Sequence, residues 1–109
     1  MNIDCQEVNE KLLNELKDLS KSSDEEICGF IVDKNKFINV NNIHPDPKNY
    51  FLISPSDYIW GDEIILFHSH PKQIEVNGFS KWDLENQFYF NLKMLLYSVK
   101  YDRFYFKEP

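Results

Sequence analysis

The sequence predicts an α+β fold in which one domain takes up residues 1–109, and three observations lead to this prediction. Helical patterns near the N-terminus and after residue 80 are separated by short segments rich in β-branched and aromatic residues. Most predicted strands follow one another closely enough for hairpin links, which favours α+β over alternating α/β. A chain of 109 residues with 42% hydrophobic residues can bury one core but is too short for two ordinary domains.

Residues 4–20 predict the first helix. Its apolar residues recur at spacings of three and four and form one stripe, namely Val8, Leu12, Leu13, Leu16 and Leu19. Asp4 and Glu7, three residues apart, predict an N-terminal capping pair. The polar residues 20–24 that follow predict a connector.

The next segments predict a hairpin and a loop. Residues 26–33 are mostly apolar and predict a buried strand. Residues 34–36 predict a tight turn and residues 37–40 the return strand. Residues 44–47 contain two prolines and predict a loop, because proline disfavours both helix and strand ladder.

Two short elements are predicted after this loop. Residues 50–53 predict a third strand. Ser54 followed by Pro55 is typical of a helix start and predicts a short helix that ends near Gly61.

The remaining elements are a fourth strand, a helix and two final strands, over residues 63–67, 80–91, 94–99 and 104–106. The fourth strand runs directly into the string His68-Ser69-His70-Pro71. The two final strands meet at a turn that contains Asp102.

The composition excludes several classes of function. A net charge of −6 repels phosphates and anionic lipids, so nucleic acids and membranes are not expected partners. No Gly-rich phosphate loop, signal peptide or transmembrane run is present, and Cys5 and Cys28 are too few for a disulfide framework. We therefore expect a soluble, cytoplasmic protein, with Cys28 as a small buried side chain.

The string His68-Ser69-His70-Pro71 is the most informative part of the sequence. Side chains two residues apart on a strand point the same way, so both imidazoles can approach one metal ion. Pro71 disfavours continuation of the strand, which leaves the pair at a strand end. A strand histidine alone is more often structural, so the pair needs a third ligand to indicate a site.

Asp83, near the start of the next helix, is the candidate third ligand. The spacing of Ser80 and Asp83 also fits a simple capping pair, and on its own that interpretation is favoured. A catalytic zinc site also needs a proton acceptor, commonly a carboxylate that is not a ligand. Glu25 and Glu26 are candidates, although composition alone favours solvated acids at a helix–strand junction.

These motifs, in their order along the chain, resemble the JAMM/MPN-plus metallopeptidases. That family's signature is a Glu, then a strand-borne H-[ST]-H-P, then S-x-x-D after a short loop. The chain has Glu26-Ile27-Cys28-Gly29, His68-Ser69-His70-Pro71 and Ser80-Lys81-Trp82-Asp83. Residues 51–58 and 95–98 are similar to stretches of phage tail-assembly proteins in the prokaryotic branch of this family. The resemblance covers residues 20–106.

The resemblance implies a curved mixed sheet flanked by the N-terminal helix and the helix that carries Asp83. It implies a zinc ion held by His68, His70 and Asp83. Glu26 would take a proton from the attacking water and pass it to the leaving amine. Ser80 would donate a hydrogen bond to the oxyanion of the tetrahedral intermediate. The reaction would be hydrolysis of a peptide or isopeptide bond.

The loop between His70 and Ser80 departs from the family pattern. It runs over residues 71–79 and is about two residues longer than is usual, which costs little loop-closure entropy. The sequence leaves open whether this loop keeps Asp83 in place, displaces it or covers the metal.

Three hypotheses follow from the sequence. The first is an active zinc peptidase in a phage or prophage tail, whose substrate is a ubiquitin-like tail, a sulfur-carrier protein extended at its C-terminus, a virion protein or a cell-wall peptide. The second is a non-catalytic MPN-like interaction scaffold in a tail or another assembly. The third is a structural zinc site in which Cys28 supplies a further ligand. His44 is expected at the surface, with a place in a substrate groove as the alternative.

Overall fold

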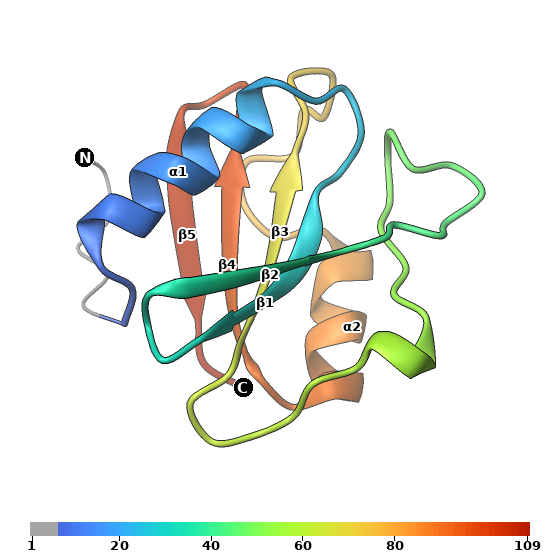
Figure 1. The fold of residues 1–109 in the computed structure, drawn as a ribbon. Helices are drawn as coiled ribbons and strands as arrows, with labels where there is room; N and C mark the ends of the chain where they lie inside the picture. Colours follow the sequence, from blue (N-terminus) through green and yellow to red (C-terminus); the bar gives the residue numbers. More distant parts are fainter. Residues whose placement is uncertain (1–6) are drawn as a thin grey trace.

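The computed structural model describes residues 7–109 and confirms the α+β fold, with two α-helices and a five-stranded mixed sheet within that range (Figure 1). The elements are α1 (Glu10–Lys21), β1 (Cys28–Val32), β2 (Lys36–Val40), the 3-10 helix η1 (Pro55–Asp57), β3 (Ile65–His70), α2 (Lys81–Phe90), β4 (Lys93–Ser98) and β5 (Arg103–Lys107). The strand order is β2-β1-β3-β4-β5. Among the four strand pairs of residues 7–109, β3 and β4 are parallel and the other three are antiparallel, and α2 connects β3 to β4.

The two helices cover opposite faces of the sheet, because alternate strand residues point to opposite sides (Figure 1). On one face, α1 packs on a cluster that includes Ile31, Phe67 and Tyr97. On the other face, Phe30, Leu66 and Met94 pack against residues of α2 and the loops before β3. No helix within residues 7–109 is long and apolar enough to cross a bilayer.

The first helix begins later than the sequence predicts. α1 starts at Glu10, where the Asn9 side chain accepts a hydrogen bond from Leu12 N at 2.8 Å. Glu7 lies outside the helix and pairs with Lys93 instead, with 3.1 Å between Oε1 and Nζ. The predicted Asp4–Glu7 cap is therefore wrong for this helix, and the part of the prediction that concerns residues 4–6 lies outside the described residues.

Replacing Asn9 with alanine is expected to cost about 1 kcal/mol, because a helix cap that accepts a backbone N–H is lost. Urea unfolding followed by circular dichroism measures this difference. Asn14→Ala is the matched control, since Asn14 lies exposed in the interior of α1, where alanine favours the helix. Equal destabilisation by both substitutions would contradict the assignment of the cap.

The predicted strand over residues 50–53 is also wrong. This segment makes a backbone hydrogen bond to a neighbour at Ile43 N–Leu52 O, 2.9 Å, and forms no ladder. The Leu52 N–H donates a hydrogen bond to the Asn42 side-chain oxygen. This bond takes the place of one that a partner strand would otherwise make. The predicted helix up to Gly61 is the three-residue turn η1.

The segment around the histidines agrees more closely with the sequence prediction. β3 begins two residues later than the predicted strand over 63–67 and ends three residues later, at His70, directly before Pro71. α2 is capped by Ser80 and ends at Asn91, which adopts the left-handed conformation with φ 54°.

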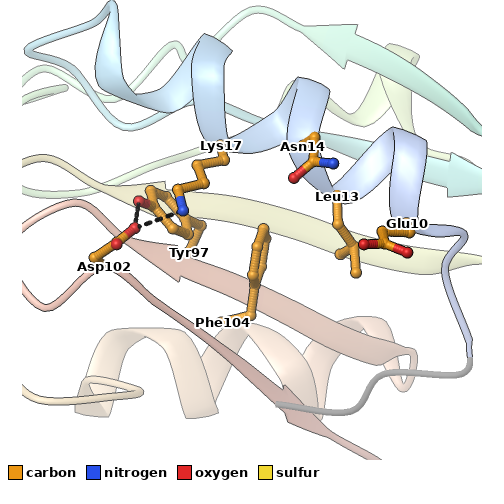
Figure 2. Close-up of a pocket in the computed structure, with 7 residues that line it drawn as sticks. All are labelled: Glu10, Leu13, Asn14, Lys17, Tyr97, Asp102 and Phe104. Atoms are coloured by element: carbon orange, nitrogen blue, oxygen red, sulfur yellow. Dashed lines mark hydrogen bonds and ion pairs between the residues drawn. The ribbon is translucent and has the colours of Figure 1, made fainter. Parts of the chain in front are cut away.

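A surface cavity of about 450 Å³ lies between α1 and the strands β4 and β5 (Figure 2). Tyr97 and Phe104 form part of its wall, and Lys17 reaches across to Asp102 with 3.1 Å between Nζ and Oδ1. The Tyr97 hydroxyl donates to the same carboxylate. None of the candidate site residues lines this cavity, so the chemistry that the motifs indicate lies on the other face of the sheet.

Candidate metal centre

The two histidines lie in the middle strand of the sheet. β3 is paired on one side with β1 and on the other with β4, so its backbone is held along its length. His68 and His70 project from the α2 face, with ring centroids 5.2 Å apart. Both side chains are buried, at 0% and 1% exposed. The sheet therefore fixes both imidazoles from the backbone outward.

Asp83 approaches the histidines from the first turn of α2. Its Oδ1 lies 3.0 Å from His68 Nε2, and its Oδ2 lies 3.0 Å from His70 Nε2. Its Oδ2 also accepts the Ser80 backbone N–H at 2.9 Å, while Ser80 Oγ accepts the Asp83 N–H at 3.1 Å. The capping and the ligand interpretations of Asp83 are therefore compatible, because one carboxylate makes both sets of contacts.

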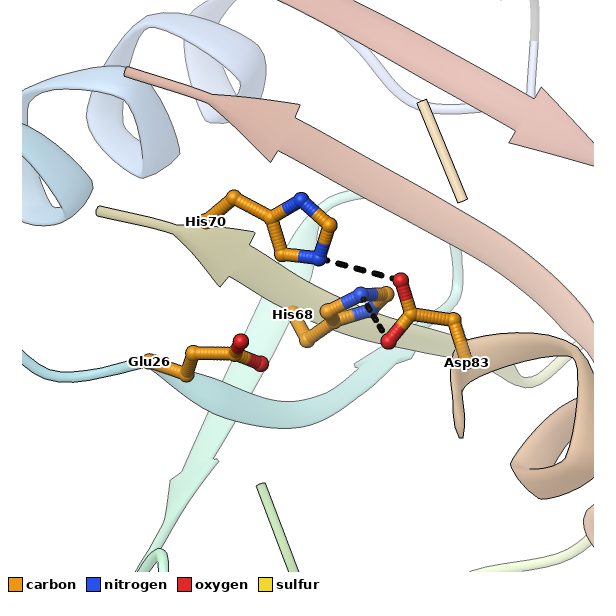
Figure 3. Close-up of side chains that lie close together, drawn as sticks. All are labelled: Glu26, His68, His70 and Asp83. Atoms are coloured by element: carbon orange, nitrogen blue, oxygen red, sulfur yellow. Dashed lines mark hydrogen bonds and ion pairs between the residues drawn. The ribbon is translucent and has the colours of Figure 1, made fainter. Parts of the chain in front are cut away.

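Glu26 completes the group from the segment before β1 (Figure 3). The ligand atoms of Glu26, His68, His70 and Asp83 all lie within 4.8 Å of one another, and all four residues are buried. Glu25, the other candidate, is exposed. The longer loop over residues 71–79 does not displace Asp83 from the histidines.

The hydrogen bonds of this group are incomplete. Within the described part of the chain, the buried side-chain nitrogens and oxygens without a hydrogen-bond partner are Glu26 Oε1, His68 Nδ1, His68 Nε2 and His70 Nδ1. His68 Nε2 is at ion-pair distance from Asp83 but is not aligned for a hydrogen bond. Buried polar atoms normally have partners, so orphaned atoms on three residues of one group indicate a site for a ligand.

The charges of the group suit a cation. Burial alone would raise the pKa of the Asp83 carboxyl, but the charge of His68 in close contact, together with the hydrogen bond and charge of His70, holds it well below its usual range. Burial lowers the pKa of His70, against the opposing effect of the Asp83 carboxylate. Ionised Asp83 and neutral His70 are the forms that coordinate metal ions. The four residues could therefore hold a metal ion at neutral pH.

Glu26 has the most perturbed environment of the group. Burial, followed by the negative charges of Asp83 and Asp46, raises its pKa to about 10. A carboxyl that is buried among other carboxylates and has an unpartnered oxygen is costly for stability, which is typical of functional positions.

Ser80 is placed beside the cluster rather than in it. Its hydroxyl oxygen accepts the Asp83 N–H, which leaves the hydroxyl proton available for donation. The residue is half-buried at the start of α2. This is the position that a donor to a reacting oxygen near Asp83 would need.

The other two candidates lie outside the cluster. Cys28 is fully buried, as expected, and its thiol lies 3.8 Å from Val40 O, so no contact supports it as a metal ligand. His44 is half-buried, with its ring 4.9 Å from the Tyr50 ring and 5.5 Å from the Trp82 ring. It is therefore less exposed than the sequence analysis expected.

Sequence reasoning missed one wall of the site. The Phe51 ring stacks on His68, with centroids 4.7 Å apart and an interplanar angle of 27°. Trp82 Nε1 donates to Phe51 O at 2.9 Å, which ties this wall to α2 beside Asp83. No period or spacing links residues 51 and 82, so only the fold reveals the contact.

Comparisons with known proteins add no assignment, since neither the family models nor the curated proteins searched match this chain. The interpretation of the site rests on its geometry and on the sequence motifs.

Proposed function

We propose that this chain is a zinc-dependent peptidase of the JAMM/MPN-plus type that hydrolyses a peptide or isopeptide bond. The observation that carries the proposal is the buried group of Glu26, His68, His70 and Asp83, with its orphaned polar atoms. The order of these residues along the chain, with Ser80 before Asp83, matches the signature of that family.

The donor set fits zinc in a catalytic rather than a closed structural site. Catalytic zinc sites use three protein ligands and keep one open position, and His68, His70 and Asp83 supply such a set. Asp83 places one carboxylate oxygen 3.0 Å from each Nε2, Oδ1 beside His68 and Oδ2 beside His70, so the three side chains meet at one point. Glu26 remains for proton transfer.

The proposed mechanism assigns one task to each remaining residue. A bound zinc ion supplies Lewis acidity, which lowers the pKa of a water molecule and polarises the scissile carbonyl. Glu26 accepts a proton from the water as its oxygen bonds to the carbonyl carbon. Glu26 then delivers that proton to the leaving nitrogen as the C–N bond breaks, giving a carboxylic acid, which keeps the second proton of the water, and an amine. The Ser80 hydroxyl donates to the developing oxyanion.

The substrate in this proposal is a peptide or a protein. A ubiquitin-like tail, a virion protein and a cell-wall peptide are the three classes to test. The stretches over residues 51–58 and 95–98 that resemble tail-assembly proteins favour the virion or cell-wall class and a place in a phage or prophage tail.

The first test is the metal content of the purified protein. Wild type purified without chelator and supplied with zinc is expected to hold one zinc ion per chain, and His70→Ala to hold less than about a tenth of that, because one of three ligands is lost. Elemental analysis after gel filtration measures this ratio. His44→Ala is the matched control, since His44 lies outside the cluster and should leave the zinc content unchanged.

Hydrolysis of a substrate panel then separates a peptidase from a scaffold. The panel contains isopeptide-linked ubiquitin-like conjugates, tail-protein peptides and cell-wall peptides. Zinc-dependent cleavage that falls at least about 100-fold in Glu26→Ala is expected for a general base. Cleavage that is equal in wild type and Glu26→Ala would refute the mechanism. Zinc binding without cleavage of any substrate would favour the non-catalytic scaffold.

A further inference from the structure

Glu26 stands just before β1, so no strand ladder holds its backbone. Its N–H donates instead to Pro47 O at 2.8 Å. Its carbonyl accepts a hydrogen bond from the Asn42 side-chain amide, with 3.0 Å between Nδ2 and O. Both backbone groups of Glu26 are therefore satisfied by the loop that follows β2.

The Asn42 amide is the centre of that loop. Its Nδ2 lies within hydrogen-bond distance of Glu26 O, Pro47 O at 3.3 Å and Tyr50 O at 2.9 Å. Its Oδ1 accepts from His44 N at 3.1 Å and from Leu52 N at 3.0 Å. An amide has two donor hydrogens and one acceptor oxygen with two lone pairs, so Asn42 uses its full capacity.

Asn42 also secures the second contact of Glu26. The carbonyl of Pro47 accepts from both the Glu26 N–H and the Asn42 amide. Loss of the Asn42 side chain would therefore remove one Glu26 hydrogen bond directly and loosen the acceptor of the other.

Ser69 holds the chain on the other side of Glu26. Ile27 N donates to Ser69 Oγ at 2.9 Å, and Ser69 N donates to Ile27 O at 2.9 Å. Ser69 lies between the two histidines, so this pair fixes the residue after Glu26 to the histidine strand. With Ile27 fixed in this way, the position of the Glu26 backbone depends on its own hydrogen bonds, one of which comes from the Asn42 amide.

The side chain of Glu26 gains little restraint by itself. Its Oε1 is buried without a hydrogen-bond partner (Figure 3). Its direction toward His68 and His70 therefore depends on where the backbone places it. Displacement of a reacting group by 1 Å costs about 100-fold in rate, so such a backbone contact matters for catalysis.

We propose that Asn42 is a positioning residue for Glu26, which fixes the backbone of the proton acceptor relative to the histidine pair. The inference rests on the proposed function of Glu26. Asn42 lies outside the group of Glu26, His68, His70 and Asp83, and its links to the Glu26 backbone run through the Glu26 and Pro47 carbonyls.

The test is a double-mutant cycle with Asn42→Ala and Glu26→Gln, using the panel substrate that wild type cleaves best. For Asn42→Ala we expect kcat to fall about 10–100-fold while KM and the zinc content stay unchanged. The double variant is expected to be no slower than Glu26→Gln alone, because positioning is irrelevant once the base is lost. Losses that multiply in the double variant, or an unchanged kcat in Asn42→Ala, would overturn the proposal.

Two further variants keep the test sharp. Asn49→Ala is the matched control, because Asn49 lies exposed in the same loop and bonds only the Asp46 carboxylate through its side chain. Asn42→Ser serves if Asn42→Ala does not fold. Serine can keep the turn bond to His44 N but is too short to reach Glu26 O.

Amide hydrogen exchange distinguishes failure of this proposal from failure of the proposed function. If wild type cleaves nothing in the panel, the catalytic role of Glu26 fails, and the exchange rates still test the contact. Asn42→Ala is expected to speed exchange of the Glu26 N–H at least about tenfold and to leave the amides of β3 unchanged. Unchanged exchange at Glu26 would show that Asn42 does not hold it.

Discussion

Replacing Gly29 with alanine is expected to destabilise the protein by more than about 3 kcal/mol, at the upper end of overpacking effects. An added Cβ would lie 2.1 Å from the carbonyl oxygen of Ile38 and 2.7 Å from the Phe37 ring. Ile38 O belongs to β2, which is bonded to β1 along five residue pairs, so it cannot withdraw without disrupting the ladder. Domains of this size have only about 5–15 kcal/mol of stability in total.

Thermal and urea unfolding followed by circular dichroism measure this loss. Gly61→Ala is the matched control, because its Cβ would meet only the flexible Ile64 side chain, at 3.2 Å. We expect a change of less than about 0.5 kcal/mol there. A Gly29→Ala protein as stable as the control would mean that β1 and β2 are not as closely paired as the structure has them.

Gly29 also matters for the site. Glu26 lies just before the start of β1, and β1 pairs with β3, the strand that carries the two histidines. Cys28 stands opposite His68, and Gly29 stands opposite Phe67. A shift of β1 would move Glu26 relative to the histidines. Any Gly29 variant that folds should therefore also bind zinc or cleave substrate less well.

Sequence predicted the second half of the fold well because the signals there are local. Ser80 caps α2 and Asn91 ends it, and both act on backbone groups within one helical turn. Pro71 ends β3 one residue after His70. The pair of histidines two apart on a strand needs no tertiary information to be recognised.

The first half was predicted less well because distant contacts decide it. Asn9 caps the start of α1, and its own backbone N–H donates to Lys34 O at 3.0 Å. Lys34 lies in the turn between β1 and β2, far from Asn9 in the sequence. The side-chain oxygen of Asn42 accepts the Leu52 N–H, which a neighbouring strand would accept in a sheet. A side chain that satisfies distant backbone groups leaves no periodic pattern in the sequence.

The candidate site divides in the same way. The spacing of His68, His70 and Asp83 indicates three residues that can meet, while Glu26 was singled out only by resemblance to a family. In the structure Glu26 is buried beside the histidines and Glu25 is exposed, a difference that the sequence alone did not indicate. The stacking of Phe51 on His68 depends on the loop that Asn42 organises, and this could not be predicted from the sequence.

Replacing Glu26 with glutamine is expected to stabilise the chelator-treated protein at neutral pH while it abolishes hydrolysis. Burial raises the pKa of Glu26 to about 10 in the folded protein, against an ordinary value of 4.5. The folded state therefore holds a proton that the unfolded state releases above pH 4.5. The proton therefore contributes fully to the free energy of unfolding below pH 4.5, and this contribution is lost as the pH rises toward 10. At pH 7 the free energy of unfolding is about 3 kcal/mol lower than below pH 4.5 on account of Glu26.

Glutamine does not titrate, so its advantage over Glu26 should vanish near pH 4.5 and grow toward pH 9. Urea unfolding in EDTA across this range measures the difference, with Glu25→Gln as the control at an exposed position, where we expect a change of less than about 0.5 kcal/mol. An advantage that is absent at pH 8 would contradict the buried, protonated state of Glu26. Added zinc should reverse the order at pH 7, because a nearby cation favours the carboxylate that only the wild type has. A residue that destabilises the fold without metal but is needed for hydrolysis with it is retained for chemistry rather than for folding.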